Sequence, residues 1–324
     1  MKCYPLLDVS TSDSTMADCG YTIYVGNNAD GVQALGYTGE GVITSVIDPG
    51  GINFDHQDFQ VNSNTRVLYI WDQTTGSGGS NHPTDFDYGT EYDSTDIDNG
   101  SCAQTAGTHG NNCIGIMAGN GAASSGTYKA MALESYIVYV KCSSSASSTY
   151  LQDGIDYVFG NASSLSKPST VSISLGNQYG PHDGTSLRNE AIDNLCGAGK
   201  IVCFVCGNSG SKRNHADATI TQESSHTFNI DVIASDFDVD FWFSGDDTLQ
   251  VYVDPPNIDE IGPIAYESSY EDTTSDGIIE IYNCTDSPSN NDHHIVVYAS
   301  PDDSNFATCT WCNIIRPAHL IKRL

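Results

Sequence analysis

The spacing of apolar residues changes near His215. Before it, short runs rich in β-branched residues alternate with segments whose apolar residues recur every three or four positions, which is typical of a parallel sheet with crossover helices. After it, apolar and polar residues alternate one by one, which indicates antiparallel strands with one buried face. The pattern predicts an α/β domain over residues 1–214 and an all-β, jelly-roll-like sandwich over 215–308, inserted or appended.

The two halves predict different elements. Four β-branched runs are expected to be strands buried on both faces: residues 41–47, 135–140, 170–175 and 201–206. Helices are expected over 150–159 and 187–195, and the strict alternation of 237–243 is the clearest strand of the second half. Residues 314–324 continue no strand pattern, so 309–324 are expected to be a basic tail or the product of a truncated or shifted reading frame.

Composition limits the classes of partner. With 41 acidic against 12 basic residues, the net charge is -29, which would repel nucleic acid and anionic membranes. No run approaches the roughly 18 apolar residues of a membrane span, and the first five residues are not followed by the apolar run of a signal peptide. We therefore expect no nucleic-acid partner and no membrane span.

The chain has 11 cysteines, an odd number, so at least one is expected to be a free thiol or to pair between chains. Cys113, Cys203 and Cys206 stand in apolar surroundings and are expected to be small core residues. The spacing of Cys309 and Cys312 could hold zinc, but no second pair accompanies it, so this interpretation is the weaker one.

Three segments carry side chains suited to acyl transfer, which needs a base, a carboxylate that orients it and donors for the oxyanion. Asp48 ends a predicted buried strand and is followed by His56 and Asp58. His109 begins a predicted helix, and Asn208 follows another strand in a Gly-Asn-Ser-Gly turn. Each has a plain alternative: a turn aspartate, a capping histidine and an ordinary Asn-Ser turn.

Together and in this order, the segments resemble the aspartate, histidine and oxyanion boxes of subtilisin-type serine proteases, over about residues 20–214. The resemblance implies a subtilisin-like fold and peptide-bond hydrolysis by an Asp-His-Ser triad. It implies that Asp48 orients His109, that His109 is the general base and that Asn208 donates to the oxyanion. The run 172–176, at the end of the third predicted strand, resembles the family's strand that pairs with substrate backbone, and Ser174, Leu175 and Gly176 are the substrate-binding residues that this implies.

The resemblance also implies a nucleophile in a G-T-S-M-A-x-P segment after Asn208, and the 324 residues contain none. Gly184-Thr185-Ser186 lacks that continuation and precedes Asn208, so Ser186 is predicted to cap a helix instead. We expect the front part of a serine endopeptidase, inactive as written. The alternative is a non-catalytic protein of the same fold that binds peptides or a protein partner.

Further expectations follow from the family. Residues 86–92 resemble a segment of clostridial and Bacteroidetes subtilisins, some of which carry a β-sandwich between the oxyanion asparagine and the serine. No cofactor is expected to be required. Structural calcium could bind the acidic stretch 85–98, although a solvated loop is the simpler interpretation. Peptide or protein substrates and an extracellular or cell-envelope location are implied by the resemblance.

Overall fold

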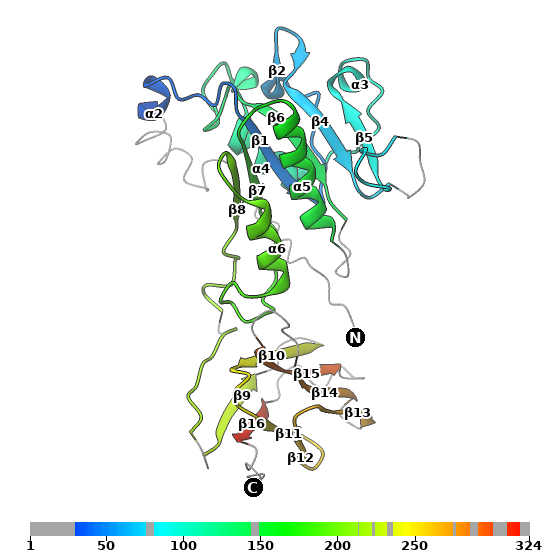
Figure 1. The fold of residues 1–324 in the computed structure, drawn as a ribbon, viewed down its shortest axis with the longest axis vertical. Helices are drawn as coiled ribbons and strands as arrows, with labels where there is room; N and C mark the ends of the chain where they lie inside the picture. Colours follow the sequence, from blue (N-terminus) through cyan, green and yellow to red (C-terminus); the bar gives the residue numbers. More distant parts are fainter. Residues whose placement is uncertain are drawn as a thin grey trace. The chain divides into compact units, whose positions relative to one another are not determined.

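The computed structural model describes residues 30–75, 81–143, 149–212, 214–221, 224–231, 236–274, 277–285, 291–300 and 310–317. The described residues of 1–177 and 191–211 form an α/β unit, and those of 178–190 and 212–324 form a β unit (Figure 1). The N-terminal residues 1–29, Cys309 and the tail after 317 lie outside this part of the chain, so the interpretations given for them stay predictions.

The α/β unit is built on a six-stranded sheet in the order β5-β4-β6-β1-β7-β8. Its strands are β1 (Ile43–Asp48), β4 (Val67–Asp72), β5 (Thr90–Asp93), β6 (Tyr136–Lys141), β7 (Ser169–Ile173) and β8 (Lys200–Phe204). The pairs β4·β6, β6·β1, β1·β7 and β7·β8 are parallel, and only β5 is antiparallel to its neighbour β4. The carboxyl ends of the parallel strands therefore meet at one edge of the sheet, where α/β proteins place their sites.

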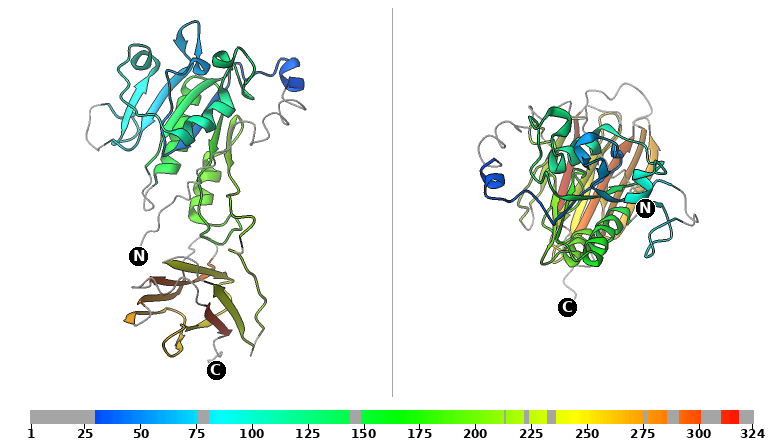
Figure 2. Two further views of the ribbon diagram at one scale, coloured as in Figure 1. Left: turned by 180° about the vertical axis from the view of Figure 1, so that it is seen from behind. Right: turned by 90° about the horizontal axis from the view of Figure 1, so that it is seen from above.

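Helices cover both faces of this sheet. Figure 1 shows α5 (Tyr150–Ser164) in front of it, and Figure 2, seen from behind, shows α4 (Thr108–Ala118) on the other side. Alternate residues of β1 face opposite sides: Ile43 and Ile47 join the core cluster that contains α5, and Val46 joins the cluster that contains α4. The remaining short elements of the unit are α2 (Asp30–Ala34), η2 (Gln57–Phe59), β2 (Gln60–Val61), β3 (Asn64–Thr65), α3 (Ser94–Asp98) and η3 (Ala122–Ser124).

A further helix, α6 (Leu187–Leu195), matches the predicted range. The Ser186 Oγ accepts the Asn189 N–H at 3.3 Å, so this serine caps the helix as predicted.

The β unit consists of two antiparallel four-stranded sheets, β10-β15-β14-β13 and β12-β11-β16-β9. The strands are β9 (His226–Asp231), β10 (Phe237–Phe243), β11 (Leu249–Asp254), β12 (Ile261–Ile264), β13 (Ser268–Thr274), β14 (Gly277–Thr285), β15 (His293–Ser300) and β16 (Thr310–Pro317). Both sheets contribute to one core cluster, for example Val251 from β11 and Ile281 from β14. The alternating pattern of 237–243 is confirmed as a strand.

Three predictions are wrong. The expectation that 314–324 continues no strand fails for residues 314–317, because they belong to β16 (Thr310–Pro317), which pairs with β11 on one side and β9 on the other. The run 201–206 is not buried on both faces: β8 is an edge strand, and Ile201 and Phe204 are 56% and 44% exposed. Cys203 and Cys206 are therefore exposed and not core residues.

No helix in the described ranges combines the length and the apolar character that crossing a membrane requires.

Candidate functional site

Asp48 is the last residue of β1 and lies two positions after Val46, so its side chain is on the face that α4 covers. Its side chain is fully buried, and its Oδ1 accepts the Gly50 N–H at 2.8 Å. Burial raises the pKa of Asp48, although the charge of His109 and hydrogen bonds from Gly50, His109 and Gly110 act in the opposite direction. The sheet thus holds a buried carboxyl group at its carboxyl edge.

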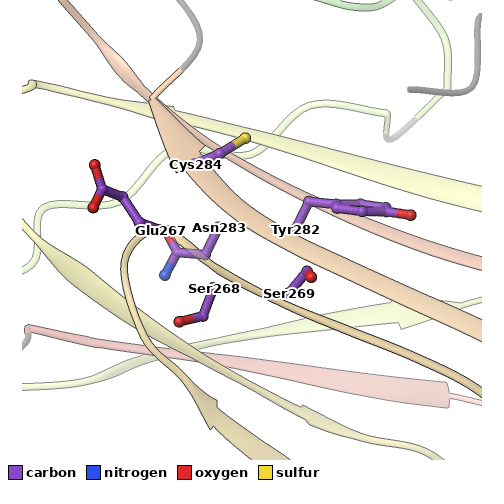
Figure 3. A pocket seen from close by; sticks show the side chains of 6 residues that line it. All are labelled: Glu267, Ser268, Ser269, Tyr282, Asn283 and Cys284. Carbon is purple, nitrogen blue, oxygen red and sulfur yellow. The ribbon is translucent and has the colours of Figure 1, made fainter.

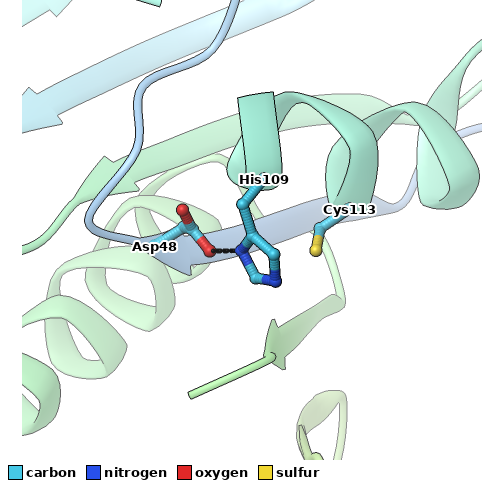
Figure 4. Close-up of side chains that lie close together, drawn as sticks. All are labelled: Asp48, His109 and Cys113. Atoms are coloured by element: carbon cyan, nitrogen blue, oxygen red, sulfur yellow. Dashed lines mark hydrogen bonds and ion pairs between the residues drawn. The ribbon is translucent and has the colours of Figure 1, made fainter. Parts of the chain in front are cut away.

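His109 is the second residue of α4, and its Nδ1 lies 2.5 Å from the Asp48 Oδ2 (Figure 4). An ionised carboxylate only accepts hydrogen bonds, so Nδ1 carries the proton in the neutral ring and Nε2 keeps its lone pair. The histidine side chain is 26% exposed. A buried carboxylate that orients a partly exposed imidazole in this way can serve a nearby hydroxyl as a general base.

The loop after β1 is attached to the start of α4 by several hydrogen bonds. The Gly107 N–H donates to the Gly51 carbonyl at 2.8 Å, and the Asn53 N–H donates to the Asn111 Oδ1 at 3.0 Å. These contacts hold the element that carries Asp48 against the one that carries His109. Their geometry favours a preorganised pair, which a catalytic site requires.

Two supporting residues were not predicted. Tyr139 of β6 is buried and donates its hydroxyl hydrogen bond to the Gly50 carbonyl, and Gln104 accepts the Ile52 N–H at 3.1 Å. Tyr139 has the signature of an ordinary strand residue, and Gln104 lies in a loop without a motif. Neither carries a local sequence signal, because both act through neighbours that are distant along the chain.

The other predicted site residues follow neighbouring parallel strands. Ser174, Leu175 and Gly176 come directly after β7, which pairs with β1, and Asn208 comes four residues after β8. These segments share the carboxyl edge of the sheet with Asp48. Asn208 is exposed and follows β8, which lies two strands from β1 in the sheet. Asp48 and His109 are the predicted residues that the hydrogen bond described above joins.

Cys113 lies one helical turn after His109 and is partly buried (Figure 4). One ligand atom each of Asp48, His109 and Cys113 lies within 4.8 Å of the others. Oxygen, nitrogen and sulfur donors of this kind suit zinc or a similar cation, and not calcium, which takes six to eight oxygens.

Some carboxylates of the acidic stretch 85–98 accept hydrogen bonds from nearby backbone N–H groups. Asp93 and Asp96 form the capping box of α3, and the Asp98 Oδ1 accepts the Thr65 N–H at 3.0 Å. Calcium binding there stays a prediction.

Replacing Asp48 with asparagine should change how stability depends on pH. Because burial raises the pKa of Asp48 above the unfolded value of about 3.9, its favourable contribution is complete below that value and is lost as the pH rises through the folded-state pKa. The variant lacks this titration. Its free energy of unfolding, relative to that of the unchanged chain, should therefore rise in urea titrations as the pH increases from the unfolded-state pKa of the carboxyl group to its raised folded-state pKa. Asp156→Asn, at an exposed position of α5, is the control. A relative stability that falls or stays constant would contradict the prediction.

Comparison with known proteins gives three findings. A model of the subtilase family, peptidase S8, matches residues 39–280. The serine protease AprX of Bacillus subtilis (strain 168) is 30% identical over 181 residues, which are 53% of this chain and 34% of AprX. The structure of the Clostridium perfringens CspB protease is similar with a TM-score of 0.74 at 22% identity, over 92% of this chain and 64% of that chain. This chain thus spans about a third of the curated relative's length and less than two thirds of the solved chain.

Proposed function

Because the chain belongs to the subtilase family of serine proteases, we propose that it carries the aspartate and histidine of an endopeptidase triad acting on peptide or protein substrates. The observation that carries the proposal is the hydrogen bond between the Asp48 Oδ2 and the His109 Nδ1 at 2.5 Å. Asp48 and His109 come from the two segments that resemble the family's aspartate and histidine boxes, and the family's mechanism needs this pair. A buried carboxylate alone, or an isolated histidine, would not support it.

Each residue has a proposed role in this reaction. Asp48 holds the ring of His109 in the tautomer that leaves Nε2 free to accept the proton of a serine hydroxyl. The Asn208 side-chain amide donates to the oxyanion as the carbonyl becomes tetrahedral. Residues 174–176 continue β7 at the edge of the site, and substrate backbone would pair with them as an added strand.

The proposal extends to the nucleophile. No G-T-S-M-A-x-P segment occurs among the 324 residues, and the Ser186 Oγ is engaged as a helix cap. We therefore propose that the polypeptide as given does not form an acyl-enzyme, and that the β unit corresponds to an insertion ahead of the serine, as in some clostridial and Bacteroidetes subtilisins. An extracellular or cell-envelope location is part of the same proposal.

A fluorophosphonate probe tests this proposal because it labels only an activated serine. The pure 324-residue polypeptide should show no labelling, and the polypeptide extended at its C-terminus by the serine-containing segment of a subtilase should be labelled. His109→Ala in the extended version should lower labelling by at least about 10³-fold. Stoichiometric labelling of the unextended polypeptide at Ser186 would overturn the assignment of the missing nucleophile.

A second function is favoured by one observation. The edge strand β8 exposes Ile201 and Phe204, and an apolar sheet edge can bind an added strand of a partner. On this alternative the fold binds a peptide or protein without hydrolysing it. Absence of labelling in the extended version, together with binding of an extended peptide to both versions, would favour the alternative over the protease.

A further inference from the structure

The hydroxyl of Tyr139 lies where β6, the loop after β1 and the start of α4 meet. Tyr139 is paired with Val46 of β1 in the parallel register, and both side chains belong to the core cluster that contains residues of α4. Its hydroxyl donates to the Gly50 carbonyl in the loop after β1. A Cβ at Gly110 would lie 1.9 Å from the hydroxyl oxygen, so the first turn of α4 also contacts it. One side chain of the sheet thus touches both elements that carry the candidate catalytic pair.

Hydrogen bonds connect this hydroxyl to His109 through Gly50. The carbonyl of Gly50 accepts from Tyr139, and its N–H donates to the Asp48 Oδ1 at 2.8 Å. The Asp48 Oδ2 accepts from the His109 Nδ1 at 2.5 Å (Figure 4). Each oxygen of the buried carboxylate therefore has a fixed donor, and the orientation of Gly50 decides whether Oδ1 keeps its own.

The Tyr139 hydroxyl stays protonated, and so stays a donor, over the whole neutral range. The side chain is fully buried, and burial raises its pKa well above the ordinary value of about 10, with the charge of Asp48 acting in the same direction. A phenol has one proton to donate, and the Gly50 carbonyl receives it. Tyr139→Phe would keep the ring in the core and remove only this donor.

We propose that Tyr139 is a positioning residue for the Asp48–His109 pair, and that its hydroxyl holds Gly50 in the orientation that keeps the carboxylate bonded on both oxygens. Burial opposes ionisation of Asp48 and raises its pKa, and three donors act against it: His109 and the N–H groups of Gly50 and Gly110. Tyr139 contacts both of these glycines. Without its hydroxyl, Gly50 can turn, Asp48 binds a proton more readily, and a protonated carboxyl group holds the imidazole less firmly. The catalytic consequence rests on the proposed function, whereas the hydrogen bonds do not depend on it.

The titratable groups that surround Asp48 come from α4, from the end of β6 and from β4. Thiols and ammonium groups ordinarily titrate above about pH 8, and burial raises the pKa of Cys142 to about 12. Lys141, opposite Asp48 in the sheet register, has its Nζ bonded to the Asp72 Oδ2 at 3.0 Å. In the acid range, charge therefore changes at carboxyl and imidazole groups here. The neighbours of Asp48 are His109 and Cys113 on α4, Tyr139, Lys141 and Cys142 on or after β6, and Asp72 on β4.

Carbon-13 NMR of the Asp48 carboxyl group tests the proposal in the 324-residue polypeptide, where no nucleophile is needed. In Tyr139→Phe this group should titrate at a higher pH than in the unchanged chain, because the donor that Gly50 supplies is no longer held in place. The His109 Nδ1 proton should exchange with water about 5–10-fold faster, which corresponds to the loss of part of one hydrogen bond. If both measurements match those of the unchanged chain, Tyr139 has only a structural role and the proposal is wrong.

Two other tyrosines provide matched controls. Tyr157→Phe removes a buried hydroxyl on α5, which donates to the Glu91 Oε1 at 2.7 Å. Tyr282→Phe removes a hydroxyl in the β unit that donates to the Glu271 Oε1 at 2.6 Å, beside an open pocket of about 370 Å³ (Figure 3). Neither change should affect the titration of Asp48 or the Nδ1 exchange rate. Equal effects of Tyr139→Phe and Tyr157→Phe would show a general loss of stability and overturn the positioning role.

The unchanged chain gives a test that does not depend on how well a variant folds. The chemical shifts of the Tyr139 Cζ and of the Gly50 amide nitrogen should change with the same midpoint as that of the Asp48 carboxyl carbon, because the three groups share one set of hydrogen bonds. A Tyr139 Cζ or a Gly50 nitrogen that does not follow Asp48 would overturn the proposal.

The catalytic consequence is measured on the version extended by a serine-containing segment. Tyr139→Phe should lower its rate of fluorophosphonate labelling about 10-fold, most strongly at acid pH, where the variant loses the ionised carboxylate first. Equal labelling rates with and without the Tyr139 hydroxyl would overturn this consequence. If the extended version with Tyr139 is not labelled at all, the proposed function fails, and the NMR results still decide the role of Tyr139.

Discussion

Arg66→Met is expected to lower the free energy of unfolding of the α/β unit by about 3–5 kcal/mol, because it removes the guanidinium that donates to the buried carbonyls of Ser135 and Ala118. Arg66 is only 6% exposed, and its guanidinium donates to the carbonyls of Ser135, Asp58 and Ala118. Ala118 is the last residue of α4, so the cation also lies at the negative end of the helix that carries His109. Burial lowers the pKa of Arg66 to about 10, and the group therefore remains charged at neutral pH.

Hydrogen exchange resolved by peptide measures this effect in the α/β unit separately from the β unit. Protection should fall in β4, β6 and α4, the elements next to these carbonyls. Lys167→Met is the matched control, because it removes the same charge from a cation that contacts the Tyr136 ring at 4.7 Å. That change should cost no more than about 1 kcal/mol. Equal losses of unfolding free energy in the two variants would show that the hydrogen bonds from Arg66 to these carbonyls stabilise the unit no more than the contact of Lys167 does.

Gly110→Ala is expected to break the contact between Asp48 and His109 and to lower stability by about 3 kcal/mol. A Cβ at this position would lie 1.9 Å from the Tyr139 hydroxyl oxygen and 2.8 Å from both the Asp48 Oδ1 and the Gly50 carbonyl oxygen. The tyrosine is fully buried and bonded to the Gly50 carbonyl, so it has little room to give way. The start of α4 would have to move away from β1, and His109 would move with it.

Proton NMR of the His109 ring and thermal unfolding measure the two consequences. The Nδ1 proton signal of the bonded pair should disappear, and the unfolding temperature should fall. Gly115→Ala provides the control in the same helix, because no atom lies within 4 Å of the Cβ that it adds. Alanine at an unstrained helix position should raise stability by about 0.5–1 kcal/mol. Retention of the Nδ1 signal in Gly110→Ala would show that α4 tolerates the added atom.

The sequence alone predicted the change of architecture near His215, and its resemblance to subtilisin-type proteases implied that Asp48 pairs with His109. Both predictions use information from short segments of the chain. Apolar periodicity reports which face of an element is buried, and each of the two residues sits in a short segment with recognisable neighbours. The predicted strands and helices of the α/β unit differ from the observed ones by a few residues at their ends, where hydrogen bonding rather than pattern sets the limit.

Only the tertiary structure decided which strand lies at the edge of the sheet, which segments pair as strands and which side chains meet across the chain. The run 201–206 is as apolar as a central strand, but its place at the sheet edge leaves it exposed, and edge position depends on strand order rather than on composition. Thr310–Pro317 is a strand because β9 and β11 supply partners on both sides. Arg66 and Tyr139 likewise act through neighbours that are distant in sequence, and such contacts exist only once the chain has folded.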